Sequence, residues 1–164
     1  MSFQKQVNAN QALGNVGQIS KAHHSFLNVI PAIAADDFVK VGSFVQSTAA
    51  ATNENEVVDA SGKQITGSIL GVVVRDSLKV AGDSTPTLEV KKGENCAILT
   101  EGSIFIEVNA IAKKGQYVFL KDADGTLGFY DTTTQSDYTY TGFRVSKGND
   151  TATAGLIEIT TARA

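Results

Sequence analysis

Few side chains in this sequence have the types and spacing that metal binding or catalysis requires. The two histidines, His23 and His24, are adjacent, whereas a metal site needs ligands on one face, four residues apart on a helix or two apart on a strand. The single cysteine, Cys96, opens an apolar stretch far from either histidine, so we expect a packed core thiol and no nucleophile. A Ser-His-Asp triad is excluded in the same way, because no histidine follows residue 24.

Carboxylates offer two further possibilities. Asp122 and Asp124 resemble the start of a calcium loop, but Gly125 falls at loop position 4 and Thr133 at position 12, where an EF-hand needs Gly at 6 and Glu at 12. A β-turn is the better interpretation. Paired carboxylates of the glycosidase kind remain formally possible on or beside strands, at Asp76, Glu89, Glu101 and Glu107. Nothing marks a pair, so we predict no enzyme activity, no cofactor and no metal.

Length and composition suit one domain that folds without metals or disulfides. The chain has 164 residues and a net charge of −3, too small to indicate a nucleic-acid partner. No apolar run reaches the length of a membrane span, and no secretory signal is evident, so we expect a protein made in a cytoplasm. With one cysteine, no intramolecular disulfide is possible.

Most of the sequence from residue 38 onward predicts short β-strands joined by glycine-containing turns. We expect about eight or nine strands, among them a strand at 38–45 with a bulge at Gly42, a short edge strand at 57–58 and a buried strand at 69–74. Asp122 to Gly125 predicts a hairpin turn, and only residues 110–114 suit a single helical turn. The expected core comprises Ile69, Val72, Val74, Ile98, Ile104, Ile106, Val118 and Phe143. The prediction is an all-β fold, a sandwich or small barrel.

The first 35 residues differ from this body. They carry Lys5 and Lys21 and no acidic residue, and seven of positions 2–18 are Gln or Asn. We interpret residues 1–35 as an extended N-terminal arm and connector, with Pro31 in the connector, and residues 36–164 as the β-barrel domain. A disordered terminus is the alternative. If the arm binds a partner, its widely spaced apolar residues would be the anchors: Phe3, Val7, Leu13, Val16 and Ile19.

The order of these features resembles a known family. The arm segments Phe3-Gln-Lys-Gln-Val7 and Ala12-Leu-Gly-Asn-Val-Gly-Gln18 precede Val41-Gly-Ser-Phe-Val45, an order similar to that of the structural cement proteins of tailed-phage capsids. Later segments also resemble the family's strands: Ile69-Leu-Gly-Val-Val-Val74, residues 90–99, residues 113–118 with Asp124-Gly125, residues 142–145 and residues 155–159. Leu13, Gln18 and residues 22–24 depart from the family pattern.

The resemblance implies a jelly-roll-like β-barrel with an extended N-terminal arm, and a function in assembly. A member of this family would sit on the outer surface of a phage head, bind the major capsid protein and neighbouring copies of itself as a homodimer or homotrimer, and clamp capsid subunits together. It would contact neither nucleic acid nor membrane. The alternatives are another virion β-module, such as a tail-tube, head-completion or fibre-associated protein, or a small-ligand-binding β-barrel. A cupin would need several histidine ligands in the body, which has none.

Overall fold

The computed structural model describes residues 14–20, 27–48, 55–75, 88–149 and 155–161. These residues form strands and turns and contain no helix, so the all-β prediction is confirmed. Residues 110–114, the one segment that suits a helical turn, do not form one. Twelve strands lie in the described ranges, compared with the eight or nine expected. In order they are β1 (Asn28–Ala34), β2 (Phe38–Lys40), β3 (Phe44–Ser47), β4 (Glu56–Asp59), β5 (Ile69–Val73), β6 (Glu89–Lys91), β7 (Asn95–Glu101), β8 (Ser103–Val108), β9 (Tyr117–Lys121), β10 (Leu127–Tyr130), β11 (Tyr138–Lys147) and β12 (Gly155–Thr161).

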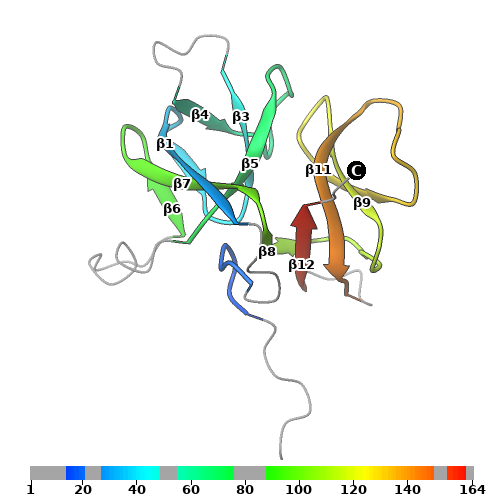
Figure 1. The fold of residues 1–164 in the computed structure, drawn as a ribbon. Helices are drawn as coiled ribbons and strands as arrows, with labels where there is room; N and C mark the ends of the chain where they lie inside the picture. The colour runs from blue at the N-terminus through cyan, green and yellow to red at the C-terminus, as the bar shows by residue number, and fades with distance from the viewer. Residues whose placement is uncertain (1–13, 21–26, 49–54, 76–87, 150–154, 162–164) are drawn as a thin grey trace, which may run out of the picture.

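The strands form a small closed barrel beside a second sheet (Figure 1). The barrel has the order β1-β4-β3-β5-β7, and the second sheet has the order β10-β9-β11-β12-β8. Strands β2 and β6 pair as a separate two-stranded ribbon. The chain passes from barrel to second sheet at Gly102, between β7 and β8, where the backbone has a positive φ that favours glycine.

Two hydrophobic clusters hold these parts together. The first joins the barrel to the second sheet, and Phe44 packs edge-on against Phe143 across it, with ring centroids 5.6 Å apart. The second fills the barrel and the space under the ribbon, with Val39, Val90 and Cys96 among its members. Cys96 is thus a buried thiol, as its sequence position predicts. Of the eight predicted core residues, six are fully buried, whereas Ile69 and Val74 are half-buried and pack against the first cluster.

Three local predictions are wrong. Residues 28–34, expected to be a connector, form β1, which pairs with β7 and β4 and closes the barrel. The strand expected at 38–45 is two strands, because Gly42 adopts φ +79° and makes a turn in place of a bulge. Residues 57–58 lie in β4, which sits between β1 and β3 and is therefore no edge strand. The hairpin at Asp122 to Gly125 is confirmed by the antiparallel pairing of β9 and β10.

Candidate interaction surface

The described part of the arm, residues 14–20, lies along the outer edge of β8. The Gly17 N–H donates to the Phe105 carbonyl at 2.8 Å, the Phe105 N–H donates to the Gln18 carbonyl at 3.1 Å, and the Ser20 N–H donates to the Ser103 carbonyl at 2.8 Å. Ile19 forms an antiparallel bridge with Ile104. These residues thus extend the second sheet by a short strand, which satisfies backbone groups of β8 that would otherwise face solvent.

A second contact joins the arm to the barrel. The Arg75 N–H donates to the Gly17 carbonyl at 2.8 Å, so Gly17 connects the end of β5 to the edge of β8. Gly17 has φ +73°, and a Cβ at this position would overlap Val41 and lie 3.0 Å from the Arg75 nitrogen. Only glycine combines this backbone conformation with so close an approach. We call residues 14–20 and their contacts on Phe105, Arg75 and Val41 the arm seat.

Of the five anchors predicted from the sequence, two lie in the described residues of this seat. Val16 and Ile19 are half-buried against the chain's own body: Val16 contacts the Gly42 turn, and Ile19 packs on the first hydrophobic cluster. Phe3, Val7 and Leu13 lie outside the described residues. The seat itself does not follow from the sequence pattern, although Gly17 is a signal for it, since only glycine allows the close backbone contact found there.

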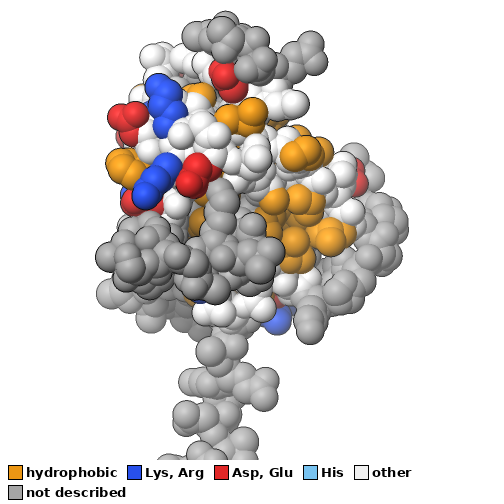
Figure 2. All heavy atoms as spheres, turned by 90° about the vertical axis from the view of Figure 1, so that its left-hand side faces the viewer, with side chains coloured by type: hydrophobic (Ala, Val, Ile, Leu, Met, Phe, Trp, Pro, Cys, Tyr) orange, Lys and Arg blue, Asp and Glu red, His pale blue; other side chains and the backbone are white. Residues whose placement is uncertain are grey.

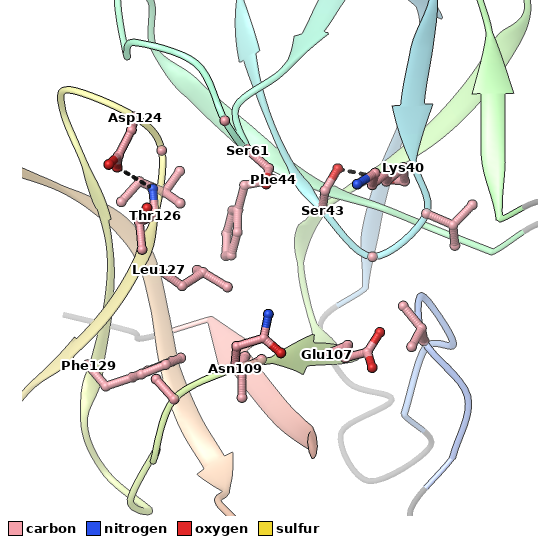
Figure 3. A pocket seen from close by; sticks show the side chains of 18 residues that line it. Lys40, Ser43, Phe44, Ser61, Glu107, Asn109, Asp124, Thr126, Leu127 and Phe129 are labelled. Atoms are coloured by element: carbon pink, nitrogen blue, oxygen red, sulfur yellow. Dashed lines mark hydrogen bonds between the residues drawn. The ribbon is translucent and has the colours of Figure 1, made fainter. Parts of the chain in front are cut away.

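A cleft of about 540 Å³ lies beside the seat (Figure 3). The barrel lines it with the turn between β2 and β3 and with Ser61-Gly62, and the second sheet lines it with the end of β8 and the β9–β10 hairpin. Val16 from the arm closes one end. Phe44, Leu127 and Phe129 form an apolar wall, so the cleft joins the seat to the first hydrophobic cluster.

The titratable groups that line this cleft come from different parts of the chain. Lys40, Glu107 and Asp124 reach it from three separate elements, and no histidine or cysteine lines it. The Asp124 carboxylate accepts the backbone N–H of Thr126 at 3.0 Å, and this hydrogen bond lowers the pKa of Asp124 from its ordinary value of 3.8. A general acid needs a raised pKa, so the shift runs in the wrong direction. Among the described residues no group of three or more His, Cys, Asp or Glu side chains is arranged to hold a metal ion.

A second exposed feature is the β2–β6 ribbon. Phe38 is 54% exposed and lies opposite Lys91, while Lys40 lies opposite Glu89 on the same outward face. Figure 2, which views the side of the molecule that carries β1 and β6, shows acidic and basic side chains beside one another on one part of this face and a group of hydrophobic side chains on another part. This mixture differs from the basic stripe typical of a nucleic-acid interface. In the parts of the chain that the structure describes, no helix has the length and apolar character needed to cross a bilayer.

Comparisons with known proteins agree with this architecture. A solved structure, "The capsid of Myoviridae Phage XM1", contains a chain of similar fold, with a TM-score of 0.59, 17% sequence identity and coverage of 98% of this chain and 97% of that chain. No curated protein matches the sequence. The model of the family described as "Structural cement protein (E217 gp24/Pam3 gp6)" matches residues 3–162, a range that includes the arm, the barrel and the second sheet. The chain therefore belongs to the structural cement protein family of bacteriophages.

Proposed function

We propose that this protein binds the outer surface of a tailed-phage capsid and clamps neighbouring major capsid subunits, thereby stabilising the mature head. The observation that carries the proposal is the family match, which extends over residues 3–162 and so includes the arm as well as the body. A cement protein does no chemistry. It stabilises by binding the assembled lattice more tightly than the loose subunits, and the free energy of that binding adds to the stability of the lattice.

The arrangement of the arm supports this function. The seat fixes residues 14–20 on the edge of β8 and on the barrel, and the residues before Gly14 carry the remaining predicted anchors, Phe3, Val7 and Leu13. An extended segment held at one end can lie along a seam between subunits. We propose that these three residues are the arm's partner contacts and that Val16 and Ile19 serve to anchor the arm on the body. The body, in turn, supplies exposed hydrophobic side chains such as Phe38 for contact with the capsid.

The test is reconstitution on phage heads that lack the protein. A variant with Phe3→Ser, Val7→Ser and Leu13→Ser should decorate heads with at least tenfold lower apparent affinity, because each lost apolar contact removes about 1 kcal/mol or more. The matched control replaces polar arm residues, Gln4→Ser and Asn8→Ser, and should decorate normally. Occupancy is measured by gel densitometry and imaging of the particles, and head stability by thermal release of DNA.

Two results would contradict the proposal. If the unaltered protein does not bind heads, or binds without raising the temperature of DNA release, it is not a cement protein. If the apolar and polar arm variants decorate equally, the body surface alone binds the capsid and the arm is not a clamp.

A further inference from the structure

The second sheet carries an aromatic surface that the arm seat and the cleft do not use. Tyr117 and Phe119 on β9, Tyr130 on β10, and Tyr138 and Tyr140 on β11 form a continuous cluster with neighbouring ring centroids 5.2–5.6 Å apart. We call these five residues the tyrosine belt. They include all four tyrosines of the chain. The Arg144 guanidinium lies over the Tyr117 ring, 4.5 Å from its centroid, which fixes one end of the belt.

Strand register places the belt on the face of the sheet that points away from the core. Val118 and Leu120, which alternate with Tyr117 and Phe119 on β9, belong to the first hydrophobic cluster. Side chains on a strand alternate between faces, so the belt lies on the opposite side. On the outer face Tyr117, Tyr130, Tyr138 and Tyr140 keep partial exposure. Phe119 is buried beneath them, against the rings of Tyr130 and Tyr140.

The belt contains an unsatisfied polar group. The Tyr140 hydroxyl is buried and has no hydrogen-bond partner. Burial raises the pKa of Tyr140, so the hydroxyl keeps its proton and remains a donor at neutral pH. A buried donor without an acceptor is uncommon in folded proteins and suggests a surface completed by a partner that brings carbonyl or amide oxygens.

The N-terminal segment of this chain has matching chemistry. If residues 3–13 are extended, alternate side chains share a face, and Phe3, Val7 and Leu13 all occupy odd positions. The even positions from 4 to 10 carry only amides: Gln4, Gln6, Asn8 and Asn10. The odd positions also carry Lys5, Ala9 and Gln11, so that face offers three large apolar side chains for the rings, while the opposite face offers amide groups for hydrogen bonds.

Charge also favours this segment as the occupant. The arm bears Lys5 and no acidic residue, while Asp131 and Asp137, which directly adjoin Tyr130 and Tyr138 in the sequence, are exposed at the border of the belt. Opposite charges at the rim of an interface favour the correct pairing more than they add to its affinity.

The direction of the arm indicates a neighbouring copy as the donor. Residues 14–20 run antiparallel to β8, so the chain before Gly14 continues from Phe105 toward Val108. The pairings of β8 with β12, β12 with β11 and β11 with β9 place Tyr117 near the level of Ser103, and Tyr130 lies directly opposite Tyr117. The other three belt residues, Phe119, Tyr138 and Tyr140, lie farther from Val108. The arm therefore leaves the sheet at the end away from its own belt. Thirteen extended residues span up to about 45 Å, enough to reach an adjoining molecule.

We propose that residues 2–13 of one copy dock on the tyrosine belt of a second copy, with Phe3, Val7 and Leu13 against the rings, so that neighbouring cement molecules are joined to one another. The inference rests on the proposed function, since a lattice brings the copies close together and at high effective concentration. Belt docking adds a binding site for the arm on the cement protein itself. This site is separate from the surface with which the body contacts the capsid.

The test uses full-length chains with one added cysteine each. Phe3→Cys in one preparation is mixed with Tyr130→Cys in another and oxidised, both on heads that lack the protein and in concentrated solution. The matched control pairs Phe3→Cys with Lys92→Cys, an exposed position on the turn after β6. The native Cys96 is buried and stays reduced. We expect at least tenfold more cross-linked dimer with the belt cysteine than with the control, as local docking raises the effective concentration of the two thiols.

A second measurement requires no cysteine. The chain has no Trp, and its four tyrosines all lie in the belt, so intrinsic fluorescence reports the belt alone. The fluorescence of the unaltered protein should change with concentration, and the variant with Phe3→Ser, Val7→Ser and Leu13→Ser should lose this change.

The outcomes separate the two proposals. Equal cross-linking at Tyr130 and Lys92 on fully decorated heads, or fluorescence independent of both concentration and arm sequence, overturns belt docking and leaves the capsid-binding function standing. A chain carrying both Phe3→Cys and Tyr130→Cys that closes an internal disulfide and forms no dimer overturns exchange between copies. If heads are not decorated at all, the cement function fails, and the solution measurements still decide the belt.

Discussion

Replacing Gly17 with alanine tests the arm seat, and Gly62 provides a matched control. Both glycines have φ +73°, so alanine at either position loses about 1–2 kcal/mol from the left-handed backbone alone. A Cβ at Gly62 meets nothing within 4 Å, whereas at Gly17 it overlaps Val41 and lies 3.0 Å from the Arg75 nitrogen. Overpacking of this kind costs about a further 1–3 kcal/mol.

The seat limits how much stability the Gly17→Ala variant can lose, because the arm can detach from the body. Four backbone hydrogen bonds join residues 17–20 to β8 and Arg75, which together contribute about 2–6 kcal/mol. We expect Gly62→Ala to lower the free energy of unfolding by about 1–2 kcal/mol and Gly17→Ala by about 2–5 kcal/mol. Urea denaturation resolves this difference, since an m value of about 1–3 kcal/mol per M turns it into a clear shift of midpoint.

Hydrogen exchange then shows where the loss occurs. The amides of Arg75 and Phe105 donate to the arm, so an extra loss of about 1–3 kcal/mol at the seat should raise their exchange rates about 5- to 150-fold over the control. Equal stability of the two alanine variants, or unchanged exchange rates of the Arg75 and Phe105 amides in Gly17→Ala, would show that close contact at Gly17 does not hold the arm on the body.

Three further predictions concern the body. Ile106→Asp should abolish folding, since it places an unpaired charge in the first hydrophobic cluster. Val74→Asp, at a half-buried position, should give folded protein with a lowered melting temperature. Expression and thermal melting distinguish the two outcomes. Tyr140→Phe should leave stability unchanged or raise it by up to about 1–3 kcal/mol, because it removes a buried hydroxyl that lacks a partner; a large loss on urea denaturation would show that this hydroxyl is bonded. Burial raises the pKa of Tyr140, and the Tyr138 hydrogen bond raises that of Tyr130, both above the ordinary value of 10.0. As the pH rises, the unfolded chain therefore loses these protons before the folded chain does. The contribution of the two tyrosines to stability is full below about pH 10 and is lost as the pH rises through their folded-state pKa values. Melting temperatures measured at increasing alkaline pH should fall accordingly.

Sequence patterns predicted most of the second sheet and less of the barrel. Strands β8, β9, β11 and β12 alternate apolar and polar residues or carry β-branched runs, which are the patterns that predict strands. Strand β1 was missed because Pro31 usually excludes a central strand. Its partner β4 pairs with it only at Ile33 and Ala34, so at Pro31 one side of β1 is free of ladder bonds. Local sequence patterns do not show which strands pair across the barrel, because this pairing joins residues that are far apart in the chain.

The interaction surfaces were predicted in part. The spacing of apolar residues identified the arm, but the docking of Val16 and Ile19 on the body depends on the edge of β8, which only the fold reveals. The tyrosine belt had a local signal, since aromatic residues stand two apart at 117 and 119 and again at 138 and 140. That signal places the rings on one face of each strand, yet it does not say which face is outward or that the strands are neighbours.

The two edges of the second sheet differ in a way that limits how the protein can polymerise. Residues 17–20 cover the edge of β8, whereas β10 at the other end pairs only with β9 among the described strands. A sheet with two open edges can add strands from other molecules without limit and grow into a fibre. With one edge blocked, edge-to-edge pairing uses the remaining edge of each molecule and ends at a closed pair. A pool of protein awaiting its capsid is thereby protected from open-ended aggregation by seven residues of its own arm.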